Sequence, residues 1–139
     1  MGKRILVVDD DREILDLTSA VLRDGGYQVL TACDGRQGVA MAQTEGPDLI
    51  LLDINMPGLD GWEALRVLRI DDETRRIPVA MFSVRYDLAE KMEALKRSAD
   101  DYIVKPFSYD EMLERVARLL SAPPAGRGWD EGVPGEARG

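Results

Sequence analysis

The sequence has no histidine and only one cysteine, Cys33, among its 139 residues. A single cysteine cannot form a disulfide within the chain, and a small domain without disulfides is typical of a reducing compartment, so we expect a cytoplasmic protein. A nucleophilic or redox-sensing thiol needs a base close to it, and the chain offers no histidine for that role. We therefore expect Cys33 to be a small, buried apolar residue.

Long apolar runs and an excess of basic residues are also missing. No apolar run approaches the ~20 residues that a membrane helix requires, and the run Ile5–Val8 near the start is too short for a signal peptide. The chain has 18 basic and 26 acidic side chains, a formal net charge of −8. The phosphate backbone of a nucleic acid would repel this charge. We expect no membrane contact and no nucleic-acid binding through this domain.

The apolar residues that are present gather in short runs. Four of these runs lack polar alternation and have the length of strands buried on both faces, as in a parallel sheet covered by helices. A weaker fifth run contains the β-branched Val29 and Thr31 and follows Gly25-Gly26, a typical helix stop. In chain order the five predicted strands are Ile5–Val8, Gln28–Ala32, Asp48–Leu52, Pro78–Phe82 and Tyr102–Val104.

The segments between and after these runs have helical spacing. The apolar stripes that predict five helices are Ile14, Leu17, Thr18, Val21 and Leu22; Val39, Met41 and Ala42; Trp62, Leu65, Leu68 and Arg69; Leu88, Met92 and Leu95; and Met112, Leu113, Val116, Leu119 and Leu120. Ser108 and Glu111 would form a capping box before the last helix. Alternating strands and helices joined by right-handed crossovers predict a doubly wound α/β sheet over residues 1–121. Residues 122–139 are rich in Gly and Pro, and we expect a disordered tail or the start of a linker.

Ligands in such a sheet bind beyond the carboxyl ends of the strands, and several chemical groups follow those ends. The first predicted strand is followed by Asp9, Asp10 and Asp11, and the third by Asp53. Asp11 fits the role of an N-cap for the next helix. The other three acids would repel one another at one sheet edge. A divalent cation would relieve this repulsion, and Mg²⁺ prefers carboxylate oxygens together with phosphate, so we interpret the three acids as a magnesium site.

Two further polar residues follow the fourth and fifth predicted strands. Ser83 follows the fourth, and Lys105 follows the fifth, immediately before Pro106. Separately, the serine could begin a turn and the lysine could be a surface residue. Together with the acids they form the set needed for phosphoryl transfer to a carboxylate: a nucleophile, a metal, and a cation and a hydroxyl that stabilise the transferred charge.

These residues closely resemble the receiver domains of bacterial and archaeal two-component response regulators. The resemblance covers about residues 3 to 120 and rests on several motifs in one order. They are the first strand with its acidic pair, ILVVDD (5–10); the loop LLDINMPGLDG (51–61); Ser83; Tyr102; and Lys105-Pro106-Phe107. The resemblance implies a flavodoxin-like sheet with strand order 2-1-3-4-5.

The resemblance also implies a role for each motif residue. Asp53 would accept a phosphoryl group from a phosphohistidine on a histidine kinase or a histidine phosphotransfer protein. Asp9, Asp10, Asp53 and the backbone carbonyl of Asn55 would hold Mg²⁺, and Lys105 would pair with the phosphoryl oxygens. The resulting phosphoprotein would act on an unknown downstream protein, as a signalling switch with at most slow self-catalysed phosphotransfer and dephosphorylation.

The remaining implied features concern the switch. Ser83 would hydrogen-bond the phosphoryl group, and Tyr102 would change rotamer with it. The Lys105–Pro106 bond is usually cis in the family, and Gly58 and Gly61 would let the loop after Asp53 turn sharply. The chain departs from the family at Val84 and Ser98, where small residues (commonly Ala and Gly, respectively) are usual. Arg85, together with Asn55, would flank the path of the water that hydrolyses the phosphorylated residue.

Two other functions use related residues. A phosphatase of the haloacid dehalogenase type also has a strand-end aspartate and Mg²⁺, but it needs a second aspartate where this chain has Asn55. A receiver-like module that signals without phosphorylation would have no need for the full set of acids, hydroxyl and lysine.

Overall fold

A computed structural model describes residues 2–83, 96 and 98–121. Its five parallel strands form one sheet in the order β2-β1-β3-β4-β5, which confirms the predicted topology. The strands are β1 (Arg4–Val8), β2 (Gln28–Ala32), β3 (Leu49–Asp53), β4 (Val79–Ser83) and β5 (Asp101–Val104). The described helices are α1 (Arg12–Asp24), α2 (Gly35–Glu45), α3 (Gly61–Ile70) and α5 (Tyr109–Ser121).

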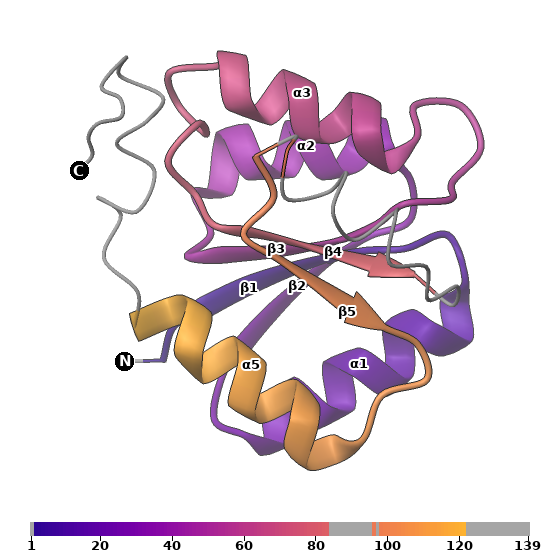
Figure 1. Cartoon of the computed structure of the whole chain (residues 1–139), viewed down its shortest axis with the longest axis vertical. Coiled ribbons are helices and arrows are strands. Elements are labelled where there is room, and N and C mark those ends of the chain that lie inside the picture. Colours follow the sequence, from indigo (N-terminus) through magenta and orange to yellow (C-terminus); the bar gives the residue numbers. More distant parts are fainter. Residues whose placement is uncertain (1, 84–95, 97, 122–139) are drawn as a thin grey trace.

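Helices cover both faces of the sheet, as the uninterrupted apolar runs predict. Helices α2 and α3 lie on one face, and α1 and α5 lie on the other (Figure 1). Every residue of β3 and β4 is buried, because these strands have neighbours on both sides and helices on both faces. Within the described residues, no helix has the length and apolar character needed to cross a membrane.

Some expectations lie outside the described residues. These are the helix predicted from Leu88, Met92 and Leu95, the departure at Val84, the expected role of Arg85, and the tail 122–139.

Polar caps fix where the described helices begin. Asp11 accepts hydrogen bonds from the backbone of Glu13 and Ile14, which confirms its predicted role as an N-cap. Asp34 caps α2 in the same way, and Asp60 forms a reciprocal capping box with Glu63 at the start of α3. The hydroxyl of Ser108 accepts a hydrogen bond from the Glu111 amide at 3.0 Å, which is the N-cap half of the capping box predicted for α5.

The buried face of α1 differs from the predicted stripe. Leu17 is 53% exposed, whereas Leu15 is buried together with the small polar residues Thr18 and Ser19. The predicted stripe placed Thr18, Val21 and Leu22 correctly, but it included Leu17 in place of Leu15 and Ser19. The face that packs on the sheet follows the i, i+3, i+4, i+7 spacing from Leu15 to Leu22, which includes the two short hydroxyl side chains.

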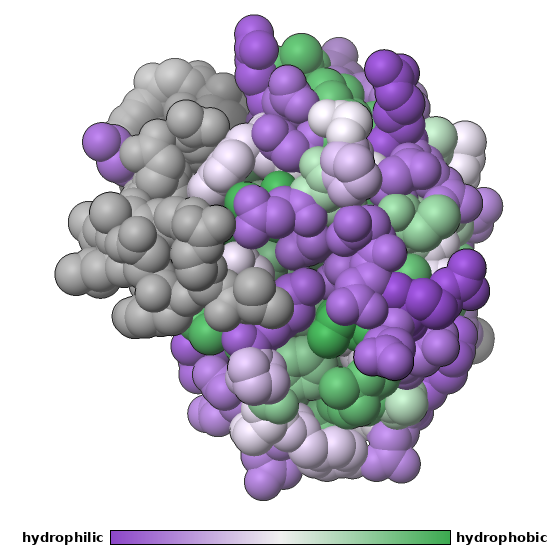
Figure 2. Space-filling model, turned by 90° about the vertical axis from the view of Figure 1, so that its right-hand side faces the viewer, coloured by the Kyte–Doolittle hydropathy of each residue, from purple (hydrophilic) through white to green (hydrophobic). Residues whose placement is uncertain are grey.

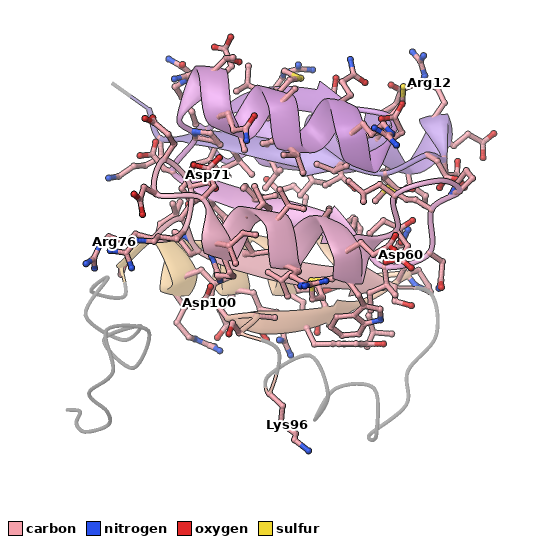
Figure 3. All side chains as sticks on the ribbon, turned by 90° about the horizontal axis from the view of Figure 1, so that it is seen from above. Arg12, Asp60, Asp71, Arg76, Lys96 and Asp100 are labelled. Atoms are coloured by element: carbon pink, nitrogen blue, oxygen red, sulfur yellow. The ribbon has the colours of Figure 1, made fainter. Side chains whose placement is uncertain are left out.

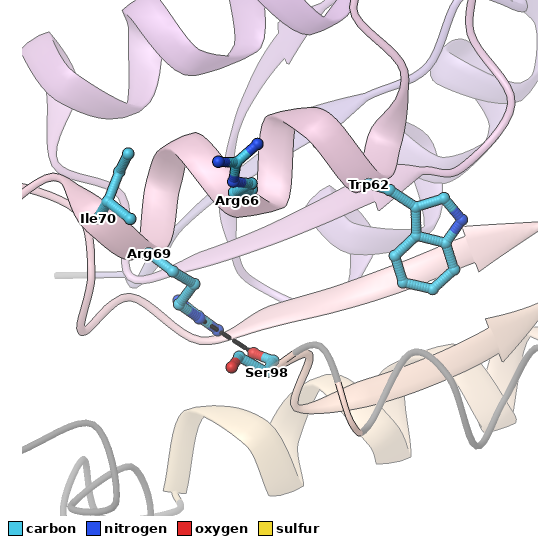
Figure 4. Close-up of a pocket in the computed structure, with 5 residues that line it drawn as sticks. All are labelled: Trp62, Arg66, Arg69, Ile70 and Ser98. Atoms are coloured by element: carbon cyan, nitrogen blue, oxygen red, sulfur yellow. Dashed lines mark hydrogen bonds between the residues drawn. The ribbon is translucent and has the colours of Figure 1, made fainter. Parts of the chain in front are cut away.

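A pocket of about 320 Å³ lies between α3 and the residues that precede β5. It is lined by Trp62, Arg66, Arg69, Ile70 and Ser98, and Figure 4 shows Arg69 reaching from α3 to Ser98. This contact belongs to the amino-terminal end of β4 and β5. Figure 3 shows Asp100, which precedes β5, at the opposite end of the sheet from Asp60, which follows the β3 loop. The contact between Arg69 and Ser98 therefore lies at the end of the sheet opposite the loop that follows β3.

Candidate functional site

The strand register brings the predicted site residues to one edge of the sheet. Val8 of β1 pairs with Leu52 of β3, so the residues that follow them, Asp9 and Asp53, lie side by side at the end of the two strands. On the other side, Asp53 pairs with Phe82 of β4. Figure 2 views this edge, where the strands end: hydrophilic residues dominate it, and apolar residues gather toward the α1 and α5 side.

Three acids converge at this edge. One carboxylate oxygen from each of Asp9, Asp10 and Asp53 lies within 4.8 Å of the others. Asp9 is fully buried and Asp53 is 4% exposed, while Asp10 faces solvent. Oδ1 of Asp9 accepts a hydrogen bond from the Asp11 amide at 2.9 Å, which orients that carboxylate. The predicted cluster is therefore present, with two buried members and one exposed member.

Lys105 supplies a buried positive charge to this cluster. Its ammonium lies 2.6 Å from Oδ2 of Asp9 and 3.4 Å from Oδ1 of Asp53, and the residue is 5% exposed. The peptide bond between Lys105 and Pro106 is cis, as the resemblance implies. Lys105 is therefore not a surface residue: its ammonium points into the acids, with the shorter contact to Asp9.

The charges of the cluster do not balance. Burial raises the pKa of Asp53 to about 6, repulsion from Asp9 adds to the rise, and Lys105 opposes it. Among the described residues, one ammonium faces three carboxylates, which leaves an excess of negative charge in a mostly buried place. Carboxylate oxygens at this spacing fit Mg²⁺, which takes oxygen ligands and keeps some of its waters. The exposed Asp10 leaves one side of the cluster open to solvent.

The remaining predicted residues surround the acids. Ser83 ends β4, is fully buried, and accepts a backbone hydrogen bond from Lys105 at 2.7 Å. Tyr102 is 1% exposed and packs in the core beneath α3. Asn55 is exposed in the loop two residues beyond Asp53. The switch roles of Ser83 and Tyr102, and the metal contact of Asn55, remain predictions.

Two glycines shape the loop after Asp53. Gly58 has a φ of 76°, a conformation that other residues rarely adopt. Gly61 is needed for a different reason, because a Cβ atom there would lie 2.3 Å from the carbonyl oxygen of Asp53. The predicted sharp turn is present, and its second glycine permits a close approach of two backbone segments.

The prediction for Cys33 is wrong. The residue is exposed, and its thiol donates a hydrogen bond to Oε1 of Gln37 at 3.3 Å. Cys33 comes directly after the last residue of β2, which is an edge strand of the sheet. The apolar character of cysteine did not decide its position here, since the chain had already left the sheet.

One residue near the site was not predicted. The ring of Phe82 lies under the Lys105 ammonium, 4.8 Å from its centroid, and is fully buried. Sequence reasoning assigned Phe82 only to the apolar run of the fourth strand. The available signal was its position directly before Ser83, in a strand adjacent to the one that ends at Asp53.

Comparisons with known proteins agree with this geometry. The family model of the response regulator receiver domain matches residues 5–117. The transcriptional regulator RpaA of a Synechocystis species is 44% identical over 117 residues, which are 84% of this chain and 48% of that protein. PhoP of Bacillus subtilis, a regulator of alkaline phosphatase synthesis, is 42% identical over 86% of this chain and 49% of its own length. The chain thus spans about half the length of these relatives.

Solved structures share the fold. The chemotaxis protein CheY4 of Vibrio cholerae has a TM-score of 0.81 and 33% identity, covering 86% of this chain and 99% of that chain. The receiver domain of the sensor histidine kinase PA1611 of Pseudomonas aeruginosa has a TM-score of 0.81 and 31% identity, covering 88% of this chain and 100% of that one. In that structure a magnesium ion is coordinated in the active site cleft.

Proposed function

This chain belongs to the family of response regulator receiver domains, and from that premise we propose that Asp53 accepts a phosphoryl group from a phosphohistidine on a partner protein. The observation that supports this most is the position of the Asp53 carboxylate, which lies 3.4 Å from the Lys105 ammonium and beside Asp9 and Asp10. The family and Asn55 together favour this function over a haloacid dehalogenase-type phosphatase, which needs a second aspartate there.

In the proposed reaction an oxygen of the Asp53 carboxylate attacks phosphorus. The phosphorus–nitrogen bond of the phosphohistidine breaks, an acyl phosphate forms on Asp53, and the imidazole leaves on the partner. A pKa of about 6 leaves the carboxylate ionised at neutral pH and therefore able to attack. Lys105 would turn from Asp9 toward the phosphoryl oxygens, and the Ser83 hydroxyl would donate to one of them.

The acids would hold the metal for this reaction. Asp9, Asp10 and Asp53 supply the carboxylates, and the carbonyl of Asn55 would complete the protein ligands. When bound, Mg²⁺ would neutralise charge on the oxygens that the phosphoryl group brings. The buried Asp9, oriented by the Asp11 amide, would act as a fixed ligand, and the exposed Asp10 would act as a ligand accessible from solvent.

The output would be conformational. Tyr102 precedes Lys105 by three residues on β5, and when Ser83 moves toward the phosphoryl group the ring can fill the space that it leaves. The affected face would include Lys96, Asp100, Asp101 and Tyr109 (Lys91, predicted on this face, lies outside the described residues). A coupling on the order of 1–3 kcal/mol is typical of such switches.

The proposed phosphorylation of Asp53 also indicates the partners. We infer a histidine kinase or histidine phosphotransfer protein as the phosphodonor and a protein as the downstream target, in the cytoplasm. The net charge of −8 argues against nucleic-acid contact through this domain. The relatives described as DNA-binding regulators are about twice as long as the matched segment, so that description refers to the longer proteins.

Phosphorylation by a small donor tests the proposal. The chain is incubated with acetyl phosphate and Mg²⁺, and its intact mass is measured against the variant Asp53→Asn. We expect one added phosphoryl group on the parent chain and none on the variant. Equal labelling of both chains would exclude Asp53 as the acceptor. Rapid, continuous release of phosphate would instead support a phosphatase.

A further inference from the structure

The Lys105 ammonium touches an aromatic ring as well as two carboxylates. Its nitrogen lies 4.8 Å from the centroid of the Phe82 ring. This separation is within the ~6 Å over which a cation is attracted to the negative face of a ring. Lys105 is 5% exposed and Phe82 is fully buried, so little water screens the attraction.

The surrounding structure fixes the ring in this place. Phe82 is paired with Asp53 across β3 and β4, and its carbonyl accepts a hydrogen bond from the Ile54 amide at 3.0 Å. The ring of Phe107 packs against it with centroids 5.7 Å apart. Phe107 follows Lys105 by two residues, so the same short segment positions both the ammonium and the second ring.

From this geometry we propose that Phe82 is a positioning residue, whose ring face holds the Lys105 ammonium and guides it during phosphoryl transfer to Asp53. The proposal rests on the function proposed above. An ammonium has three N–H donors, and a ring attracts it without requiring one donor to point at a single atom. The ring attraction changes little as the ammonium moves across the face, whereas a hydrogen bond to a carboxylate is directional. Lys105 can therefore exchange Asp9 for a phosphoryl oxygen while it stays over the ring.

A purely structural role for Phe82 makes a different prediction. If the ring only fills the core, its electron density is unimportant and its volume alone matters. Fluorine substituents on the ring withdraw electron density from its face and change its size little. They would weaken the hold on the ammonium in steps and leave the packing nearly intact.

The chain offers a matched control for this experiment, because it contains only two phenylalanines. Mono-, di- and trifluorophenylalanine are incorporated at position 82 or, separately, at position 107. Both rings belong to the same aromatic pair, and among the described residues only Phe82 has an ammonium over its face. The variants Phe82→Tyr and Phe82→Leu complete the set, since the first keeps an aromatic face and the second keeps only apolar volume.

Two measurements are made on each protein. The first is the phosphorylation rate with acetyl phosphate and Mg²⁺, which should fall stepwise at position 82 to about one fifth with three fluorines. Phe82→Leu should lose at least as much, and Phe82→Tyr should stay within about twofold of the parent chain. The second is the exchange of the Lys105 ammonium protons with water, followed by NMR without a phosphodonor. It should quicken along the same series.

The outcomes separate this inference from the proposed function. The role of Phe82 would be overturned if neither the phosphorylation rate nor the ammonium exchange changes with fluorination at position 82. It would also be overturned if fluorination at position 107 changes both equally. If the parent chain takes up no phosphoryl group, the proposed function fails. The ammonium exchange then still decides whether the ring holds Lys105.

Discussion

The guanidinium of Arg69 donates two hydrogen bonds to the carbonyl oxygen of Ser98, at 3.0 Å from Nε and 2.8 Å from Nη2. Ser98 has a φ of 77°, and among the described residues it is the only non-glycine residue with a positive φ. This conformation costs a residue other than glycine on the order of 1 kcal/mol or more. Arg69 also bonds to Asp100 and to the carbonyl of Ile77.

We predict that Arg69→Met lowers the free energy of unfolding by about 2–4 kcal/mol. The variant removes the ion pair with Asp100, which keeps its hydrogen bond from the Val79 amide, and takes the Arg69 donor from three part-buried backbone carbonyls. The control is Arg118→Met, because Arg118 is 66% exposed and pairs only at 3.5 Å with Glu114, so its loss should cost under about 0.5 kcal/mol. Urea denaturation measures both variants, and equal losses would contradict the role of Arg69.

Lys105→Met should destabilise the protein in EDTA by about 3 kcal/mol at neutral pH. Among the described residues, Lys105 supplies the cation paired with both Asp9 and Asp53, so the substitution leaves two buried carboxylates to repel each other. Mg²⁺ should restore more stability to this variant than it adds to the parent chain, because the ion replaces the missing charge. Thermal unfolding with and without Mg²⁺ measures the stability of the variant and of the parent chain. The control is Lys96→Met, because Lys96 is exposed. A loss that Mg²⁺ does not reduce would contradict the shared-charge interpretation.

Asp53→Asn should stabilise the protein in EDTA, increasingly so as the pH rises from about 4 to 7. The pKa of Asp53 is about 6 in the folded chain against an ordinary value of 3.8, so across this window the folded state binds more protons than the unfolded state. Stability of the parent chain therefore falls as pH rises through the window, relative to a variant that cannot ionise. The difference should approach about 3 kcal/mol at pH 7. A difference that does not depend on pH would show that burial leaves the pKa of Asp53 at its ordinary value.

Asp10→Asn should weaken Mg²⁺ binding by about tenfold or more, and Asp11→Asn should leave it nearly unchanged. Asp10 belongs to the acid cluster, whereas Asp11 bonds to the first turn of α1 and asparagine can replace it as an N-cap. Titration calorimetry with Mg²⁺ compares the two variants. Similar affinities would mean that the second acid of the cluster is misassigned.

The sequence predicted the sheet and most of the site because both depend on local patterns. Uninterrupted apolar runs identified the buried strands, and their order along the chain gave the edge where Asp9, Asp53 and Lys105 meet. The cap of α1 at Asp11 was also predictable, because capping depends on residues within one turn.

Features that depend on tertiary packing could not be predicted in the same way. The exposure of Cys33 follows from the edge position of β2, and the exposure of Leu17 follows from how α1 is turned on the sheet. The preference of Lys105 for Asp9, and its position over Phe82, depend on distances of a few tenths of an ångström between separate strands. No spacing along the chain contains that information.

The central claim, that the Asp53 side chain is the phosphorylated group, has a direct test. The chain is labelled with acetyl phosphate and Mg²⁺, then reduced with borohydride, which converts an aspartyl phosphate to homoserine. Peptide sequencing by mass spectrometry identifies the converted position. We predict homoserine at position 53 and unmodified aspartate at positions 9 and 10. Homoserine at either of those positions, or no conversion at position 53 in a labelled chain, would contradict the account.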